Sequence, residues 1–224
     1  MMKLLIVSAT SSEISPLLKE LILTRKVSKH FSSMKFLSSD IDVLITGVGM
    51  VATSFHLTKI LSTHTYDRII NAGIAGSFSQ FIDMGSVYEV VKDQFSEIGA
   101  ENSSEFLTPF DLGFQEFNEF PFESGFLFNR DSFLSNSFPE ASSITVNKVH
   151  GCEEEIAKIK LQYSPELETM EGAAFFYVCK MLSVPCAQLR SVSNLIEKRN
   201  KSAWDIPFAI ESLNLALINI LTDV

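Results

Sequence analysis

The chain has 224 residues, of which 46% are hydrophobic and 20% are charged, a composition typical of a folded domain with one sizeable core. The net charge of −9 argues against non-specific binding to nucleic acids or anionic membranes, because such binding needs a basic surface. The sequence has no run of 18 apolar residues, so we expect no transmembrane helix and no membrane partner.

The first predicted element is a strand over residues 3–9. This apolar run is too short for the core of a secretory signal and fits a strand buried on both faces. Ser11 or Ser12 then offers a helix N-cap and Pro16 suits a first turn, so a helix is predicted up to about residue 26.

The rest of the chain alternates between short apolar runs and stretches with helical periodicity. These patterns predict strands at 41–46, 68–72, 87–91, 143–149 and 185–192, and helices at 50–62, 153–161, 171–182 and 206–221. Such alternation is typical of an α/β fold. We therefore expect a single domain over residues 1–224, with a mixed, mostly parallel central sheet flanked by helices.

The segment 95–138 departs from this pattern. It holds eleven of the nineteen phenylalanines, separated by Gly, Pro, Asn and Glu without a regular period. One interpretation is a long loop that anchors itself with aromatic side chains, and the other is an apolar wall over a ligand. Both can hold at once.

The cysteines and histidines do not form a metal or disulfide pattern. The chain has three cysteines, an odd number without CxxC spacing, at Cys152, Cys179 and Cys186, and its four histidines are scattered. We expect reduced thiols, a cytoplasmic location, and neither a metal nor a cofactor.

Ligands of parallel α/β sheets bind beyond the carboxyl ends of the strands. Here those ends include glycine pairs at residues 47–49 and 73–76, which would let a ligand approach the backbone. Neither pair matches GxGxxG or GxxxxGK[ST], so a dinucleotide or nucleoside triphosphate site is not indicated.

Two carboxylates stand near predicted strand ends and helix starts. Glu13 and Glu171 could simply be acids that favour a helix N-terminus. Glu171, however, opens the buried-looking helix EGAAFFYVC, where a carboxylate can accept hydrogen bonds from the vicinal diol of a ribose. A carboxylate shielded from water is also a better general base.

The chain resembles the nucleoside phosphorylase and nucleosidase superfamily in four stretches, which are, in chain order, KLLIVSATSSE, IINAGIAGS, LETMEGAAFFYVC and QLRSVSN. TVNKVHGCEEE and the tail NLIEKRNKSAWDIP are similar to the futalosine hydrolases within it. The resemblance covers nearly the whole chain and is weakest over 95–138. It implies hydrolysis of futalosine to release hypoxanthine, in menaquinone synthesis.

The resemblance also implies roles for individual residues. Glu13 matches the acid that activates the attacking water, and Glu171 the acid that binds the ribose hydroxyls. Met170 would pack under the sugar, and Gly76 would line the sugar and water site. Asn194 stands where adenine-specific nucleosidases carry an aspartate, and its NH₂ group can donate to O6 and N7 of a 6-oxopurine. A plain structural role at the strand end is the alternative for Asn194.

Two further departures bear on the substrate. Asn71 and Ile74 stand where phosphorylases of this superfamily carry phosphate-binding residues, so water is the expected nucleophile. The benzoate of futalosine needs a cationic or donor partner, and the candidates are Lys198, Arg199 and Lys201 on the loop after Asn194, together with His150. A solvated surface charge is the more common fate of such loop residues, and His150 is equally open to a structural role.

Three functions remain open at this stage: a futalosine hydrolase, a methylthioadenosine or adenosylhomocysteine nucleosidase, and a non-catalytic protein that binds purine nucleosides. Asn194 and the tail motif count against the second, and the presence of both Glu13 and Glu171 counts against the third. The only expected partners are the small-molecule nucleoside and a second copy of the chain, because relatives are often homodimers.

Overall fold

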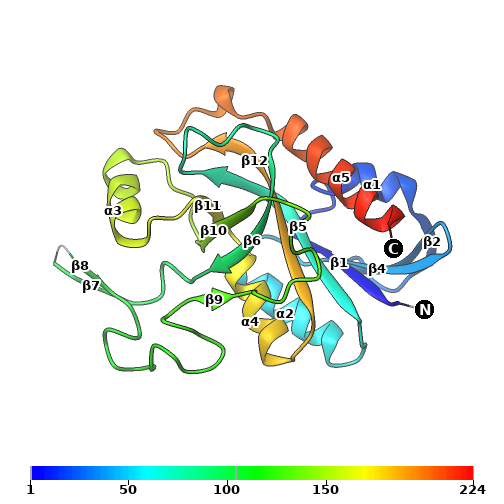
Figure 1. Ribbon diagram of the computed structural model, residues 1–224, viewed down its shortest axis with the longest axis horizontal. Helices are drawn as coiled ribbons and strands as arrows, with labels where there is room; N and C mark the ends of the chain where they lie inside the picture. The colour runs from blue at the N-terminus through cyan, green and yellow to red at the C-terminus, as the bar shows by residue number, and fades with distance from the viewer. Residues whose placement is uncertain (1, 104, 224) are drawn as a thin grey trace.

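The computed structural model describes residues 2–103 and 105–223. It contains one α/β unit around a twisted mixed sheet, as the alternating pattern predicts (Figure 1). The strands are β1 (Leu4–Ser8), β2 (Ile22–Lys26), β3 (Phe31–Phe36), β4 (Ser39–Ile45), β5 (Arg68–Ser77), β6 (Val87–Asp93), β7 (Ala100–Asn102), β8 (Glu105–Leu107), β9 (Leu127–Phe128), β10 (Glu140–Thr145), β11 (Leu167–Thr169) and β12 (Cys186–Leu195).

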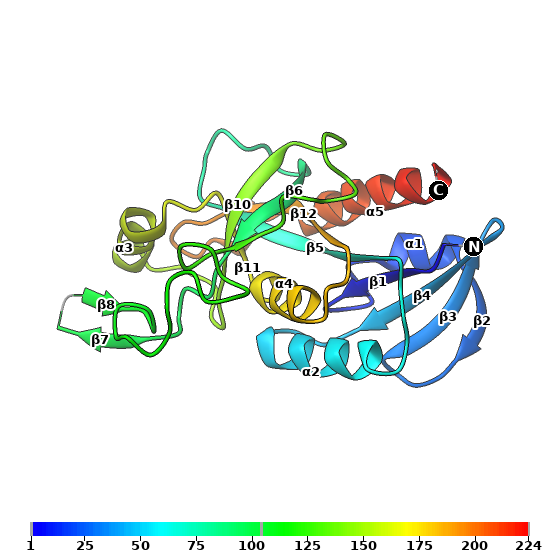
Figure 2. The same ribbon diagram turned by 60° about the horizontal axis from the view of Figure 1, so that its bottom comes forward.

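The helices are α1 (Ser15–Glu20), α2 (Met50–Leu61), α3 (Glu153–Tyr163), α4 (Gly172–Met181) and α5 (Ile206–Thr222), with a 3-10 turn at Lys201–Ala203. Helices α1 and α5 cover one face of the sheet, and α2 and α4 cover the other (Figure 2). Two apolar cores fill the spaces between these layers, because the central strands carry apolar side chains on both faces.

The sheet runs in the order β11-β10-β6-β12-β5-β1-β4-β3-β2. Strand β5 pairs in parallel with β1 and β12, and its end also pairs antiparallel with β11. This last pairing joins the edge of the sheet back to its centre. The carboxyl end of β5 is therefore flanked by β12 on one side and by β11 on the other.

The structure corrects the helix predicted up to residue 26. Helix α1 ends at Glu20, and residues 22–26 form β2, which pairs with β3 as an antiparallel hairpin. All five side chains of β2 are exposed, so the strand lacks the alternating burial by which sequence patterns reveal strands. Pairing at the edge, rather than burial, makes this segment a strand.

Strand ends also differ from the prediction. Strand β5 extends through the glycines at 73–76 to Ser77, whereas the predicted strand ended at residue 72. Strand β10 covers 140–145 rather than 143–149, which frees residues 146–150 to cross the carboxyl ends of the strands. The short strand β11 is missing from the sequence prediction, because three residues carry too little pattern.

The C-terminal segment 201–222 is long and apolar enough to cross a membrane by length and composition alone. In the fold, however, α5 packs on the sheet and on α1, and Leu213, Leu217 and Leu221 are buried in the core on that side. Its apolar character is therefore explained as that of a core helix.

Candidate active site

All seven residues singled out as site residues line one cavity of about 390 Å³ at the carboxyl ends of the central strands. They are Glu13, Gly76, His150, Met170, Glu171, Asn194 and Arg199. Ile74, which follows the same strand end, lines it as well, whereas Lys198 and Lys201 do not. The strand-end rule and the fold thus bring these residues together from six separate segments of the chain.

Glu13 lies in the turn after β1 and is held through both carboxylate oxygens. Oε2 accepts hydrogen bonds from the Thr10 backbone N (2.9 Å) and hydroxyl (3.0 Å) and from Ser8 Oγ (3.3 Å). Oε1 accepts one from the backbone N of Ile74 (3.2 Å). These bonds aim a fixed carboxylate at the end of β5, where it lines the cavity.

Glu171 stands at the N-cap of α4, and its Oε1 accepts a hydrogen bond from the backbone N of Gly49 (2.9 Å). It is 8% exposed. Burial raises the pKa of Glu171, and the nearby positive charge of Arg190 opposes that rise. The Glu171 carboxylate therefore lies at the cavity wall with its Oε1 held by the backbone of Gly49.

Arg190 is one of two residues beside the site, the other being Glu168, that the sequence prediction missed. It lies on β12, is 1% exposed, and donates from Nη2 to Oδ1 of Asn71. Burial lowers the pKa of Arg190, while the charges of Glu171, Glu13 and Asp93 act to raise it. A lone arginine in the otherwise uncharged strand CAQLRSVSN was the available signal.

Gly73 makes room for this arginine rather than for a ligand. A Cβ at Gly73 would lie 2.6 Å from Arg190 Nη1 and 3.0 Å from Glu13 Oε1. The absence of a side chain therefore allows the guanidinium and the Glu13 carboxylate to approach the same point of β5. Asn71 is buried below the cavity, where it bonds Arg190 and the Val7 carbonyl.

Asn194 closes the cavity from β12. Its Oδ1 accepts a hydrogen bond from Ser193 Oγ (2.9 Å), and its Nδ2 donates to the Leu195 carbonyl (3.0 Å). The side-chain NH₂ group has two hydrogens, so one remains for a ligand. Both hydrogens of this NH₂ group were predicted to bond the purine, whereas the bond to Leu195 uses one of them.

His150 and Glu168 form a buried pair at the opposite wall, with side chains 7% and 2% exposed. Nδ1 of His150 bonds Oε2 of Glu168, and the His150 backbone N donates to Oε1 (3.0 Å). The hydrogen bond with Glu168 raises the pKa of His150. Glu168 was missed by the sequence reasoning, because β11 was not predicted.

Three phenylalanines of the segment 95–138 line a different cavity. Phe95, Phe110 and Phe122 pack with Tyr177 of α4 and line a cavity of about 910 Å³ beside α2. None of the eleven phenylalanines of segment 95–138, all of which are described, lines the Glu13 cavity. The segment thus anchors itself on α4, as the first interpretation holds.

Comparisons with known proteins agree with this geometry. A family model described as the phosphorylase superfamily matches residues 3–223. The chain is 28% identical over 188 residues to a futalosine hydrolase of Thermus thermophilus, covering 80% of each chain. It is 27% identical over 237 residues to a 5'-methylthioadenosine/S-adenosylhomocysteine nucleosidase of Buchnera aphidicola, covering 95% of this chain and 92% of the relative.

The fold also matches solved structures. The native structure of futalosine hydrolase of Helicobacter pylori superposes with a TM-score of 0.82 at 16% identity, and the match covers 100% of this chain and 98% of that one. The family match, the α/β architecture and the cavity at the strand ends lead to one assignment. The chain belongs to the phosphorylase superfamily, as an enzyme of the nucleosidase kind.

Proposed function

We propose that this enzyme hydrolyses the N-glycosidic bond of futalosine and releases hypoxanthine and dehypoxanthine futalosine, a step of menaquinone synthesis. The observation that carries the proposal is that Glu13, Glu171 and Asn194 meet in one cavity. They supply a base, a diol-binding acid and a hydrogen-bond donor for a 6-oxopurine. The similarity to futalosine hydrolases supports the same choice.

In the proposed reaction Glu13 accepts a proton from water as the water oxygen bonds C1′ of the ribose. The C1′–N9 bond breaks, and its electron pair passes to the purine, which takes up a proton from solvent while Glu13 returns its own proton to solvent. Four hydrogen bonds hold Glu13, so it needs little reorganisation. Glu171 would accept hydrogen bonds from the ribose hydroxyls, with Met170 packing under the sugar and Gly76 lining the floor.

Water, rather than phosphate, is the proposed nucleophile. Ile74 offers an apolar side chain to the cavity, and Asn71 is buried beneath it with its oxygen bonded to Arg190. The remaining charges close to Glu13 include Glu171, which repels an anion. A phosphate would therefore meet two carboxylates there, and the nearby Arg190 is buried and already donates to Asn71.

The benzoate end of futalosine would lie toward Arg199, which lines the cavity and stacks on Trp204 at 5.2 Å. Arg199 is exposed and lines the cavity, so its guanidinium is the proposed carboxylate partner. His150 is less suited to that role, because Glu168 already occupies its Nδ1.

A methylthioadenosine or adenosylhomocysteine nucleosidase is the second candidate, because relatives of that name match most of the chain. Asn194 separates the two: an amide NH₂ suits the O6 and N7 acceptors of hypoxanthine, whereas an acid suits the N6–H and N7 pair of adenine. A protein that only binds nucleosides would have no use for Glu13.

The proposed assembly is a cytoplasmic homodimer. A patch that we call the α2 surface holds Met50, Val51, Phe55, Ile98 and the rings of Phe95, Phe110, Phe122 and Tyr177. Val51 is 82% exposed and Phe55 is 60% exposed, so covering the α2 surface would remove apolar side chains from water. Met50 follows Val48 and Gly49 at the active cavity, so a second copy on the α2 surface would border the site.

The proposed location is the cytoplasm. The three cysteines are free thiols, which suits the cytoplasm.

The test is to mix the purified protein with futalosine, inosine and methylthioadenosine, with and without phosphate, and to identify the products. We expect hypoxanthine from futalosine at a rate independent of phosphate, with a free ribosyl product. Release of adenine from methylthioadenosine at a higher rate would favour the second candidate. A ribose 1-phosphate product would refute hydrolysis.

A further inference from the structure

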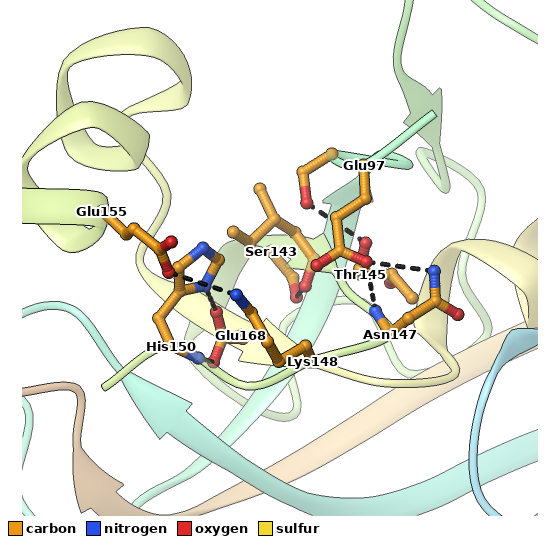
Figure 3. A network of polar contacts seen from close by, with 10 residues as sticks. Glu97, Ser143, Thr145, Asn147, Lys148, His150, Glu155 and Glu168 are labelled. Carbon is orange, nitrogen blue, oxygen red and sulfur yellow. Dashed lines mark hydrogen bonds and ion pairs between the residues drawn. The ribbon is translucent and has the colours of Figure 1, made fainter. Parts of the chain in front are cut away.

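One buried carboxylate differs from the others in having no donor. In the network of Figure 3, Glu97 accepts hydrogen bonds from the backbone N (2.6 Å) and Nδ2 (3.0 Å) of Asn147, and Glu155 pairs with Lys148 (3.3 Å). Glu89 of β6 is 0% exposed, and both of its carboxylate oxygens are buried without a hydrogen-bond partner among the described residues. Buried charges are normally paired, so a partner from outside the chain would be favourable for Glu89.

Glu89 lines a cavity of about 490 Å³ that shares no lining residue with the active cavity. It lies between β6, the start of β10 and the segment 128–135. Val91, Phe128 and Ala141 contribute an apolar part to its wall. The cavity therefore combines an unpartnered carboxylate with room and apolar surface for a small organic molecule.

The acidic groups of this cavity favour a cation. Glu89 and Glu140 are directly opposite each other on the paired strands β6 and β10, so their side chains project on the same face of the sheet. Like charges in such positions repel each other, and a positive group between them would relieve the repulsion. Burial raises the pKa of Glu89, the hydroxyl of Ser132 acts to lower it, and the charge of Glu140 adds to the rise. A third carboxylate, that of Glu166, lines the same cavity.

The two cationic side chains that line the cavity have other partners. Lys92 Nζ lies 3.7 Å from the centroid of the Phe126 ring, and Arg130 Nη2 pairs with Glu123 Oε2 at 3.1 Å. Neither of them donates to Glu89, whose oxygens have no partner within the described part of the chain. The carboxylate therefore stays unneutralised by the protein itself.

We propose that this cavity binds an aliphatic diamine in its diammonium form, with one ammonium group between Glu89 and Glu140 and the other toward Glu166. An ammonium group has three N–H donors, enough to bond both oxygens of Glu89 and one of Glu140. The carbon chain would pack against the apolar side chain of Val91. A metal ion fits less well, because the described residues contain no group of three or more His, Cys, Asp or Glu side chains placed to hold one.

The experiment is a calorimetric titration of the wild-type protein with 1,4-diaminobutane at pH 8, where aliphatic amines are protonated. The ligand control is 1,4-butanediol, which has the same four-carbon chain with uncharged ends. The diamine should bind at least about tenfold more tightly than the diol, because its hydrogen bonds to carboxylates are charge-assisted. Equal affinity for the two compounds, or binding of neither, would overturn the proposal.

Two variants locate the bound diamine. Glu89→Gln keeps the side-chain shape, removes the charge and should weaken binding by about tenfold or more. Ser135→Phe, at an exposed position that lines the cavity, should weaken binding by filling the space without a change of charge. Glu153→Gln is the matched control, because it removes the same charge from an exposed position outside the cavity, and it should bind as the wild type does.

Thermal unfolding of each variant shows that it is folded before its affinity is compared. Unchanged affinity in folded Glu89→Gln would place the diamine elsewhere on this acidic protein and refute the site. The inference does not depend on the proposed function, because the titration contains no nucleoside and needs no turnover.

Discussion

At the scale of single residues, the active cavity depends on carboxylates whose surroundings differ. Glu13 has four donors within hydrogen-bond reach, whereas Glu171 is held by backbone donors alone and burial raises its pKa. Buried Arg190 lies among them and supplies positive charge to both. Two carboxylates in one small cavity can therefore carry different roles.

Substituting Glu13→Gln removes the proposed base while keeping the side-chain shape. Loss of a general base typically lowers turnover by about 10²- to 10⁴-fold. We expect that loss in kcat for futalosine, with Tm little changed. Glu20→Gln, an exposed glutamate on α1, serves as the control and should retain wild-type kcat. A Glu13→Gln variant with near wild-type turnover would remove Glu13 from the mechanism.

Substitutions at Asn194 test how the purine is recognised. Asn194→Ala removes a donor that matters more as negative charge collects on the purine, so kcat should fall more than KM rises. The expected loss is about 1–3 kcal/mol, or roughly ten- to hundredfold. Asn194→Asp should slow hypoxanthine release at neutral pH, because an ionised acid repels O6 and N7.

Paired kinetics on futalosine and its 6-amino analogue check both Asn194 variants, with Asn200→Asp on the exposed following loop as control. The ratio of the two rates should shift toward the 6-amino substrate only for Asn194→Asp. A wild-type preference for the 6-amino compound would show that Asn194 does not read the 6-oxo group.

At the scale of elements, a buried polar cluster joins β6, β10 and β12 under the start of α4. Asp93 accepts hydrogen bonds from Thr145 Oγ1 (2.9 Å), the Gln94 backbone N (2.8 Å) and Gln188 Nε2 (3.1 Å). Gly172, the first residue of α4, packs directly against Asp93, since a Cβ at Gly172 would lie 2.2 Å from Asp93 Oδ2. This cluster helps to fix the helix that carries Glu171.

Burial raises the pKa of Asp93 from its ordinary 3.8 to about 6. The folded protein therefore binds this proton more tightly than the unfolded chain, and the contribution to stability falls as pH rises from about 4 to 6. Above that range the buried charge costs about 3 kcal/mol, from the size of the pKa shift.

Asp93→Asn should therefore stabilise the protein at pH 8, by up to about 3 kcal/mol, and by much less at pH 4. Among the described residues, Gln188 Oε1 has no hydrogen-bond partner and can accept from the new amide. Denaturant unfolding at both pH values measures this, with exposed Asp40→Asn as a control expected to change stability by less than about 0.5 kcal/mol. Destabilisation of Asp93→Asn at pH 8 would mean that the carboxylate's hydrogen bonds outweigh its desolvation.

At the scale of the whole molecule, the α2 surface distinguishes a monomer from a dimer. If a second copy covers it, Val51→Glu combined with Phe55→Glu places charges in an apolar interface and should convert a dimer into a monomer. Sedimentation velocity measures the change. Leu161→Glu is the control, because Leu161 is 88% exposed on α3 and outside the surface. A wild-type protein that sediments as a monomer would end the dimer proposal.

The sequence alone determined the α/β class, the strands and helices of the central layers, and a set of residues at strand ends. This was possible because central strands are continuous apolar runs, and because parallel strands bring their carboxyl ends to one edge. The seven predicted site residues therefore line one cavity. The roles of these residues stay predictions until the substitutions are measured.

Only the tertiary structure decided how the walls of the cavity are built. Arg190 and Glu168 lie on strands that read as structural, and their partners Asn71 and His150 are 119 and 18 residues away in the chain. The exposed β2 is a strand because it pairs with β3, the next strand along the chain, without the burial that a local pattern would show. The three-residue β11 is a strand because it pairs with β5, a segment far away in the sequence. Hydrogen bonds and charges between such segments depend on which strands become neighbours, and that is set by packing of the whole chain.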